Sequence, residues 1–315
     1  YGITYAYIIA QEDGASTGNN IDDRNDQEVH VVYGQYRGIL GGNLSLTFAY
    51  VQDGCGNVTG AACTHLPDDI YNIGFRQAGK LYGINYRAEY YHQWGSANAT
   101  ASTLTDSGLG NTNQTRNPIN QPDVDRDAYM FGVRVGKTFA NVTMQPSLTI
   151  MYDYLSGTSD EDLTGSDASY NSFNTLFDTG HKFYGLADVF LGVGSGSQAS
   201  GTSGLGLQDA AIKAQFNPMP DWTFRAHYHW FWTAESPQAN PATGICNTTL
   251  QERNTGGCNS ALGNELDLAL THHYNPNMNV AFGFSNYTTT ASFRDMRNVV
   301  GDAANWGYVQ MMLKF

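Results

Sequence analysis

Alternation of apolar and polar residues with a period of two dominates this chain. Residues 81–94 read LYGINYRAEYYHQW. Every second position from Tyr82 to Trp94 carries a ring, Ile or Ala, whereas the positions between carry Gly, Asn, Arg, Glu, Tyr and Gln. Successive side chains of a strand point to opposite faces, so this pattern predicts a strand with one apolar and one polar face.

The same alternation recurs along the chain and predicts twelve strands. They cover residues 1–10, 28–37, 43–53, 69–78, 81–95, 125–138, 142–155, 205–217, 221–235, 263–274, 278–290 and 304–315. Strands of globular sheets usually have about 5–6 residues, and most of these are twice as long. They are long enough for a tilted crossing of a bilayer, which needs about 9–11 residues.

The connections between the predicted strands alternate in length. Short ones cover 38–42, 79–80, 139–141, 217–220 and 275–277, and long ones cover 11–27, 54–68, 96–124, 156–204, 236–262 and 291–303. Short turns at one end and long loops at the other are typical of outer-membrane barrels. We therefore expect an all-β, transmembrane antiparallel β-barrel, a single domain over 1–315, with both termini periplasmic. The chain starts at Tyr1 without a leader, so either a signal peptide has been removed or N-terminal strands are missing, and the strand count rises in the second case.

The composition excludes further classes of protein. Only 14% of residues are charged and 13% are aromatic, the net charge is -13, and the mean hydropathy is -0.38. No stretch approaches 18 apolar residues, which excludes a helical membrane protein, and the acidic balance argues against a nucleic-acid partner. Aromatic residues near strand ends and a last strand ending on Phe315 favour lipid as the partner of the apolar face. The alternative is a soluble secreted β-sandwich that binds glycans.

The strand pattern also predicts which charged residues line the inside of the barrel. The inward basic set comprises Arg76, Arg87, Arg126, Arg134, Lys213, Arg225 and Lys314, with His30, His227 and His229, and the acidic set comprises Glu89, Asp153, Asp209, Glu265 and Asp267. Guanidinium groups on a pore wall favour anions. We expect Arg76, Arg87, Glu89, Arg126, Arg134, Lys213, Arg225, His227 and His229 to line the pore and contact solute. The alternative is that wall Arg and Glu residues simply pair with each other.

Two features of the long loops suggest further chemistry. Cys55 and Cys63, and Cys246 and Cys258, form two local pairs. Four cysteines allow three connectivities, of which local pairing is the simplest, and it predicts two loop disulfides formed in an oxidising compartment. Acidic clusters, at Asp22, Asp23 and Asp26 and at Asp160, Glu161, Asp162 and Asp167, could bind Ca²⁺ or bridge to lipopolysaccharide phosphates. Solvated loop faces are the alternative, and no other cofactor is predicted.

The longest connection carries a distinctive motif. Residues 173–190 read FNTLFDTGHKFYGLADVF, and a Gly206-Leu-Gln-Asp209 strand start follows. This resembles the alginate export family of outer-membrane porins. The positions that match the family pattern are Phe173, Asn174, Leu176, Phe177, Thr179, Gly180, His181, Lys182, Tyr184, Gly185 and Asp188. Phe183 replaces a common Tyr, and Asp178 stands where Pro is usual.

The resemblance implies an outer-membrane channel for hydrophilic, anionic solutes or polysaccharide. It is good over the C-terminal 150 residues or so, and the family's best-known member has more strands than twelve. In one interpretation the motif folds into the pore as a constriction formed by Asp178, His181 and Lys182. In the other, its aromatic residues pack on the wall, and Asp178 or Asp188 pairs with Lys182.

The motifs of common enzymes are missing. The sequence has no Gly-x-Ser-x-Gly elbow, His-Glu-x-x-His or P-loop, so we expect no enzyme. His227 and His229 share a face, but the sequence shows no third metal ligand beside them, and we expect no metal. Two other functions stay open: a plugged structural or adhesive barrel that binds partners or oligomerises, and the sheath of a porin–cytochrome conduit.

Overall fold

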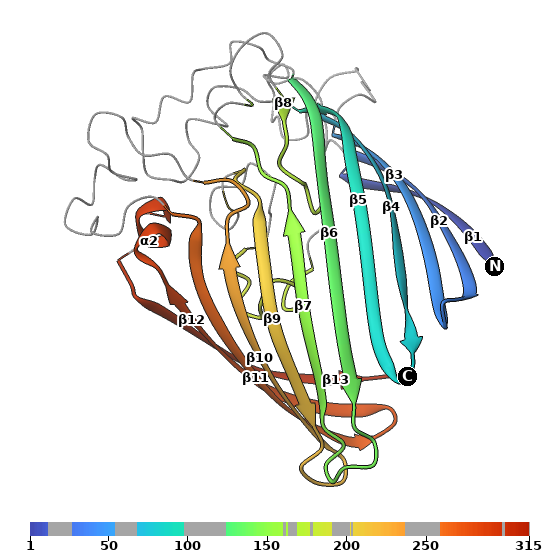
Figure 1. The fold of residues 1–315 in the computed structure, drawn as a ribbon, viewed down its shortest axis with the longest axis vertical. Coiled ribbons are helices and arrows are strands. Elements are labelled where there is room, and N and C mark those ends of the chain that lie inside the picture. Colours follow the sequence, from blue (N-terminus) through green and yellow to red (C-terminus); the bar gives the residue numbers. More distant parts are fainter. Residues whose placement is uncertain are drawn as a thin grey trace, which may run out of the picture.

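The structure is a computed structural model and consists of one large antiparallel sheet (Figure 1). It describes residues 1–11, 27–53, 68–97, 124–159, 162, 169–176, 179–190, 202, 204–236, 259–297 and 300–314. The long strands are β1 (Gly2–Gln11), β2 (Gln27–Ile39), β3 (Gly42–Asp53), β4 (Asp68–Leu81), β5 (Ile84–Ala97), β6 (Val124–Thr138), β7 (Ser147–Leu155), β9 (Leu207–Phe216), β10 (Trp222–Trp232), β11 (Ala261–Asn275), β12 (Met278–Thr289) and β13 (Ala303–Leu313). Each pairs with its neighbour along the chain, and a short β8 (Ser169–Tyr170) pairs with β6 in parallel.

The twelve predicted strands are confirmed, with one boundary to correct. The strand predicted over 142–155 begins only at Ser147. Residues 139–146 form a turn in which Met144 and Gln145 adopt positive φ values of 66° and 46°. The Phe139 N–H donates to the carbonyl of Pro146 at 2.8 Å and closes this turn. Since proline has no N–H for a strand ladder, the strand starts after it.

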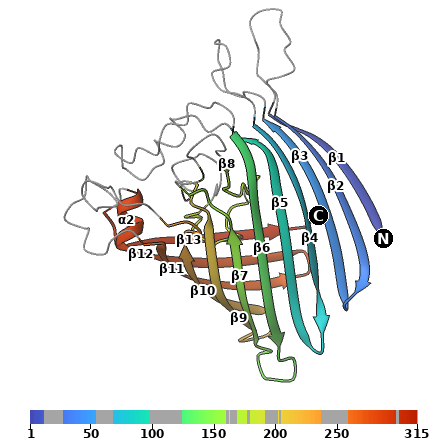
Figure 2. The same ribbon diagram turned by 45° about the horizontal axis from the view of Figure 1, so that its top comes forward.

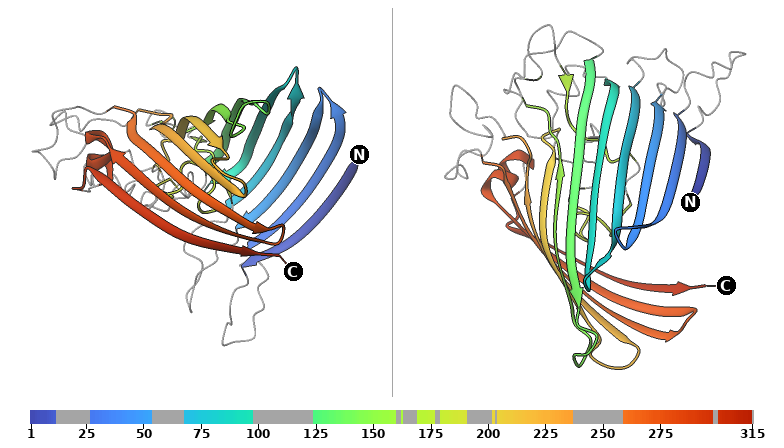
Figure 3. Two further views of the ribbon diagram at one scale, coloured as in Figure 1. Left: turned by 90° about the horizontal axis from the view of Figure 1, so that it is seen from below. Right: turned by 45° about the vertical axis from the view of Figure 1, so that its right-hand side comes forward.

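The sheet curls into the wall of a β-barrel. Figure 2 shows β1–β7 side by side and β9–β13 turned strongly relative to them. Seen from below, the sheet forms an arc with β1 and β13 at its two ends (Figure 3). In the part of the chain that the structure describes, no backbone pairing joins these two edges.

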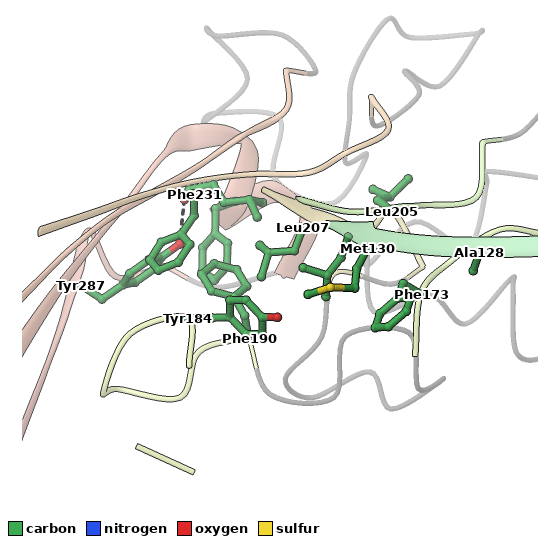
Figure 4. Packing of buried hydrophobic residues seen from close by; sticks show 12 residues of the cluster. Ala128, Met130, Phe173, Tyr184, Phe190, Leu205, Leu207, Phe231 and Tyr287 are labelled. Atoms are coloured by element: carbon green, nitrogen blue, oxygen red, sulfur yellow. Dashed lines mark hydrogen bonds between the residues drawn. The ribbon is translucent and has the colours of Figure 1, made fainter. Parts of the chain in front are cut away.

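The two faces of the sheet carry the side chains that the alternation predicts. Ile73, Phe75 and Phe282 lie on the convex face and are 50%, 41% and 48% exposed. On the concave face, an apolar cluster packs between β6, β7, β9–β12 and the 171–190 segment (Figure 4). A smaller one, formed by Val29, Val51 and Ile70, lies on β2–β4. Among the described residues, every helix is too short to cross a bilayer.

Helix α2 (Ala291–Arg297) was not predicted. It follows β12 directly, and the hydroxyl of Thr290 accepts a hydrogen bond from the Phe293 N–H at 3.1 Å. This is the N-cap arrangement that satisfies a free amide at the start of a helix. Phe293 then packs against Tyr287 of the apolar cluster, with ring centroids 5.3 Å apart. A helix of only seven residues leaves little periodic signal in the sequence.

Candidate functional site: the inner wall and its loop

Two ion pairs lie side by side on the concave face of β5–β7. Arg87 pairs with Glu89 two residues along the same strand, and Arg134 on β6 donates to Asp153 on β7 at 3.0 Å. Gly132 lies between the two carboxylates. A Cβ at this position would come within 2.5 Å of Asp153 Oδ1 and 3.1 Å of Glu89 Oε1. The missing side chain therefore lets two buried acid–base pairs approach each other.

A second cluster of polar side chains lies on the adjoining part of the wall, on β9–β12. The carboxylate oxygens of Asp209 lie 2.8 and 2.9 Å from Nδ1 of His229. The hydroxyl of Ser285 donates to Asp267 Oδ1 at 2.6 Å. Asp209, His229, Asp267 and Ser285 are all at most 2% exposed. Buried charges are stable only when they are paired or hydrogen-bonded, so these contacts hold the side chains in fixed positions.

The 171–190 segment, which contains the predicted motif, crosses this concave face. Gln93 on β5 and Asn174 exchange two hydrogen bonds of 2.7 and 2.8 Å. Further along the segment, the N–H groups of Leu186 and Ala187 both donate to Glu265 Oε1 on β11 at 2.8 Å. Gly185 (φ +87°) lies directly on this carboxylate, since a Cβ there would be 2.4 Å from Oε2. The segment is thus fixed to two distant parts of the wall.

The Gly-His-Lys corner of the motif lies against the last strand. The His181 ring stacks on Trp306 of β13, with centroids 4.3 Å apart. Asp188 accepts from the His181 N–H at 2.6 Å and lies 2.7 Å from its Nδ1. Lys182 lies over the Phe183 ring at 5.2 Å. The interpretation that Asp188 pairs with Lys182 is therefore wrong, because the backbone turn places His181 at that carboxylate.

A cavity of about 250 Å³ separates part of this segment from the wall. It is lined by charged side chains of β5–β7, by amides and hydroxyls, and by aromatic rings: Asn72, Arg87, Glu89, Tyr91, Gln93, Met130, Arg134, Asp153, Phe173, Asn174, Thr175, Leu176, Thr179, Phe183 and Tyr184. Guanidinium groups can bind a carboxylate, and ring faces can pack on a sugar-like ring. The cavity is a candidate site for solute contact.

A wider hollow of about 960 Å³ lies near the end of β5 and the start of β6. Its lining includes Asp125, Arg126, Asp162 and Glu235. Burial raises the pKa of Glu235 above its ordinary value, and the nearby Asp162 carboxylate raises it further. Asp162 belongs to the acidic cluster for which Ca²⁺ was predicted, and the other members of that cluster lie outside the described residues.

The structure places the predicted wall residues in three kinds of surroundings. Arg87, Glu89 and Arg134 line the cavity. Arg76 and Lys213 are half-buried and Arg225 is exposed, and none of these three has an ion-pair partner among the described residues. Arg126 is only 4% exposed, because Tyr170 and the carbonyl of Ser172 cover its guanidinium.

Other functional residues lie on the convex face, outside the described part of the chain, or at contacts that the sequence did not predict. His30 was expected inside but lies on the convex face, where Tyr5 and Tyr50 flank its ring. Asp178 and all four cysteines lie outside the described residues, so the disulfides stay predictions. The anchoring roles of Gln93, Glu265 and Trp306 were not recognised. Gln93 and Glu265 were on the polar face of their strands, but the sequence does not say that a distant loop reaches them.

The whole chain was compared with known proteins. The family model described as alginate export matches residues 12–306. No curated protein matches. Similar solved structures include a NanC porin at 8% identity, which covers 93% of this chain and 95% of that chain with a TM-score of 0.37. A KdgM porin has 9% identity, coverages of 92% and 93%, and a TM-score of 0.32. Outer membrane phospholipase A from Escherichia coli has 12% identity, coverages of 92% and 79%, and a TM-score of 0.31.

Proposed function

Because the chain belongs to the alginate export family and is an outer-membrane channel for hydrophilic solutes, we propose that it prefers anions. The cavity lined by Arg87 and Arg134 carries this proposal. Each guanidinium donates to a carboxylate through Nη2, and neither group makes a further hydrogen bond among the described residues. Groups of this kind have spare donors for the carboxylate of a passing solute.

The charges without ion-pair partners on the same face support the anion preference. Arg76, Lys213 and Arg225 add three positive charges whose fields are not cancelled by a direct ion pair in the described part of the chain. The acidic residues of the wall instead form ion pairs or hydrogen bonds with Arg87, Arg134, His229, Ser285 and the loop amides. Uncancelled positive charge along a pore favours the entry of anions.

The transport function leaves no evident role for catalysis on the wall. His229 and Asp209 form a buried pair of the kind that hydrolases use, but the nearby serine does not donate a hydrogen bond to the histidine. Ser285 donates to Asp267 rather than to the histidine, and a nucleophilic serine needs the imidazole as its base. We therefore propose a channel without enzymatic activity.

A test of the anion preference is the reversal potential across a KCl gradient in a planar bilayer. We expect stepwise openings that favour chloride in the wild type. Arg76→Glu and Arg225→Glu should each lower the chloride-to-potassium permeability ratio several-fold. Lys137→Glu is the matched control, because Lys137 lies on the convex face beside Phe139 and its charge change is the same. Cation preference in the wild type would refute the proposal.

A plugged barrel is the second candidate, and the anchored 171–190 segment favours it. The segment is tied to β5, β11 and β13, so it obstructs part of the concave face. Absence of openings in a well-inserted protein would support a structural or partner-binding role. Openings that appear only after Glu265→Ala would show that the segment itself closes the pore.

A further inference from the structure

His227 and His229 acquire a third potential metal ligand in the folded wall. They lie two residues apart on one face of β10, and Asp267 on β11 is the direct cross-strand partner of His227. One donor atom from each of these three side chains lies within 4.8 Å of the other two. His229 and Asp267 are 1% and 2% exposed, and His227 is half-buried.

Hydrogen bonds to neighbouring residues leave one nitrogen of His229 and one carboxylate oxygen of Asp267 available as metal ligands. Nδ1 of His229 lies 2.8 Å from a carboxylate oxygen of Asp209, and Oδ1 of Asp267 accepts from the Ser285 hydroxyl at 2.6 Å. The remaining atoms, Nε2 of His229 and Oδ2 of Asp267, face each other at 3.8 Å. Oδ2 is buried without a hydrogen-bond partner in the described part of the chain. A carboxylate behind a histidine and a hydroxyl behind a carboxylate are typical outer contacts of metal ligands.

We infer that His227, His229 and Asp267 bind one divalent first-row transition-metal ion, of which Zn²⁺ is the probe. Two imidazoles and one carboxylate form a common three-ligand set that leaves a coordination position open. Bonds of about 2.0–2.2 Å in a tetrahedral site place ligand atoms about 3.3–3.6 Å apart. Side-chain rotations of His227 can bring its ring nitrogen this close, because that residue has no hydrogen bond among the described contacts.

The local charge also favours a cation. The carboxylates of Asp209, Glu265 and Asp267 face this part of the wall, and Lys213, the partner of His227 on β9, supplies one positive charge. Arg225, two residues before His227 on β10, supplies a second positive charge, so the three acidic side chains outnumber the basic ones by one. The competing explanation is a protonated His229 held between Asp209 and Asp267, with no metal.

The test uses the full chain refolded in detergent, stripped with a chelator and titrated with Zn²⁺ against a chromophoric competitor. We expect one tight ion per chain. His227→Gln and Asp267→Asn should each weaken binding by more than about 100-fold, and Asp209→Asn, which removes the carboxylate that orients His229 and one local negative charge, by about 10–100-fold. His92→Gln is the control, since that histidine lies on the convex face of β5 beside Trp94.

X-ray absorption of the Zn²⁺-loaded wild type makes the result independent of how the variants fold. Two histidine nitrogens and a carboxylate oxygen at about 2.0–2.2 Å would support the site. The inference is overturned if the wild type binds no ion tightly, if His227→Gln and Asp267→Asn bind as well as the wild type, or if the spectrum shows sulfur or only oxygen ligands. None of these readouts depends on whether the channel conducts.

Discussion

The middle of the sheet and its edges are built from the same alternating sequence but differ in burial. On β9, in the middle, the inner-face residue Leu207 is completely buried. On β1, at the edge, Ile8 faces the same side, opposite Val29, and is 51% exposed. Leu207 packs in the apolar cluster together with residues of the 171–190 segment, whereas β1 has a neighbouring strand on one side only. Strand pattern alone therefore determines which way a side chain points, but not whether anything covers it.

The largest effect is expected from a loss of packing in the middle of the sheet. Leu207→Ala removes a side chain from the apolar cluster and should reduce the free energy of unfolding by about 2–5 kcal/mol. Ile8→Ala should cost less than about 1 kcal/mol, because half of that side chain is already exposed. Urea unfolding of the protein in micelles, followed by tryptophan fluorescence, measures both. Equal losses would contradict the comparison.

An intermediate effect is expected where Glu265 holds the segment. Glu265→Ala removes the acceptor of both amides, which should weaken local docking by about 1.5–3 kcal/mol. Hydrogen exchange at the amides of Leu186 and Ala187 should then accelerate roughly 10- to 100-fold.

A local readout is needed for this variant, because removing a buried acidic group beside Asp267 can raise global stability. Glu89→Ala is the matched control: its carboxylate is also buried but pairs with Arg87. If both variants leave the exchange of the two amides unchanged, Glu265 is not the anchor.

The smallest effect is expected at the contact between His181 and Trp306. His181→Ala removes a stacked ring pair and should loosen the motif corner by about 0.5–1.5 kcal/mol. His181→Phe keeps the ring and should restore most of that loss, although it cannot pair with Asp188. Limited proteolysis within 179–190 measures how often this corner opens. Equal cleavage of the two variants would assign the stabilisation to the ion pair instead.

The sequence predicted most of the wall and little of what lies against it. Long strands such as β5 have strict alternation, so their faces and even the inward position of Glu89 followed from it. On β2 the apolar residues Val29, Val31 and Val32 occupy both faces, and His30 was therefore placed on the wrong side. The meeting of His229 with Asp209 and Asp267 depends on the register between β9, β10 and β11. The short 217–220 turn sets the register of β9 and β10, but a long loop separates β10 from β11, and sequence does not set the register across it.

The anchoring of the 171–190 segment has a consequence for the order of assembly. Strands of the sheet pair with their neighbours along the chain, so hairpins can form early, at a low cost in chain entropy. The segment is different, because Glu265 and Trp306 lie some 80 and 125 residues beyond their partners Leu186 and His181. It can dock only after β11 and β13 have joined the sheet. The wall is therefore built around an open interior, and the segment closes over it as a late folding step.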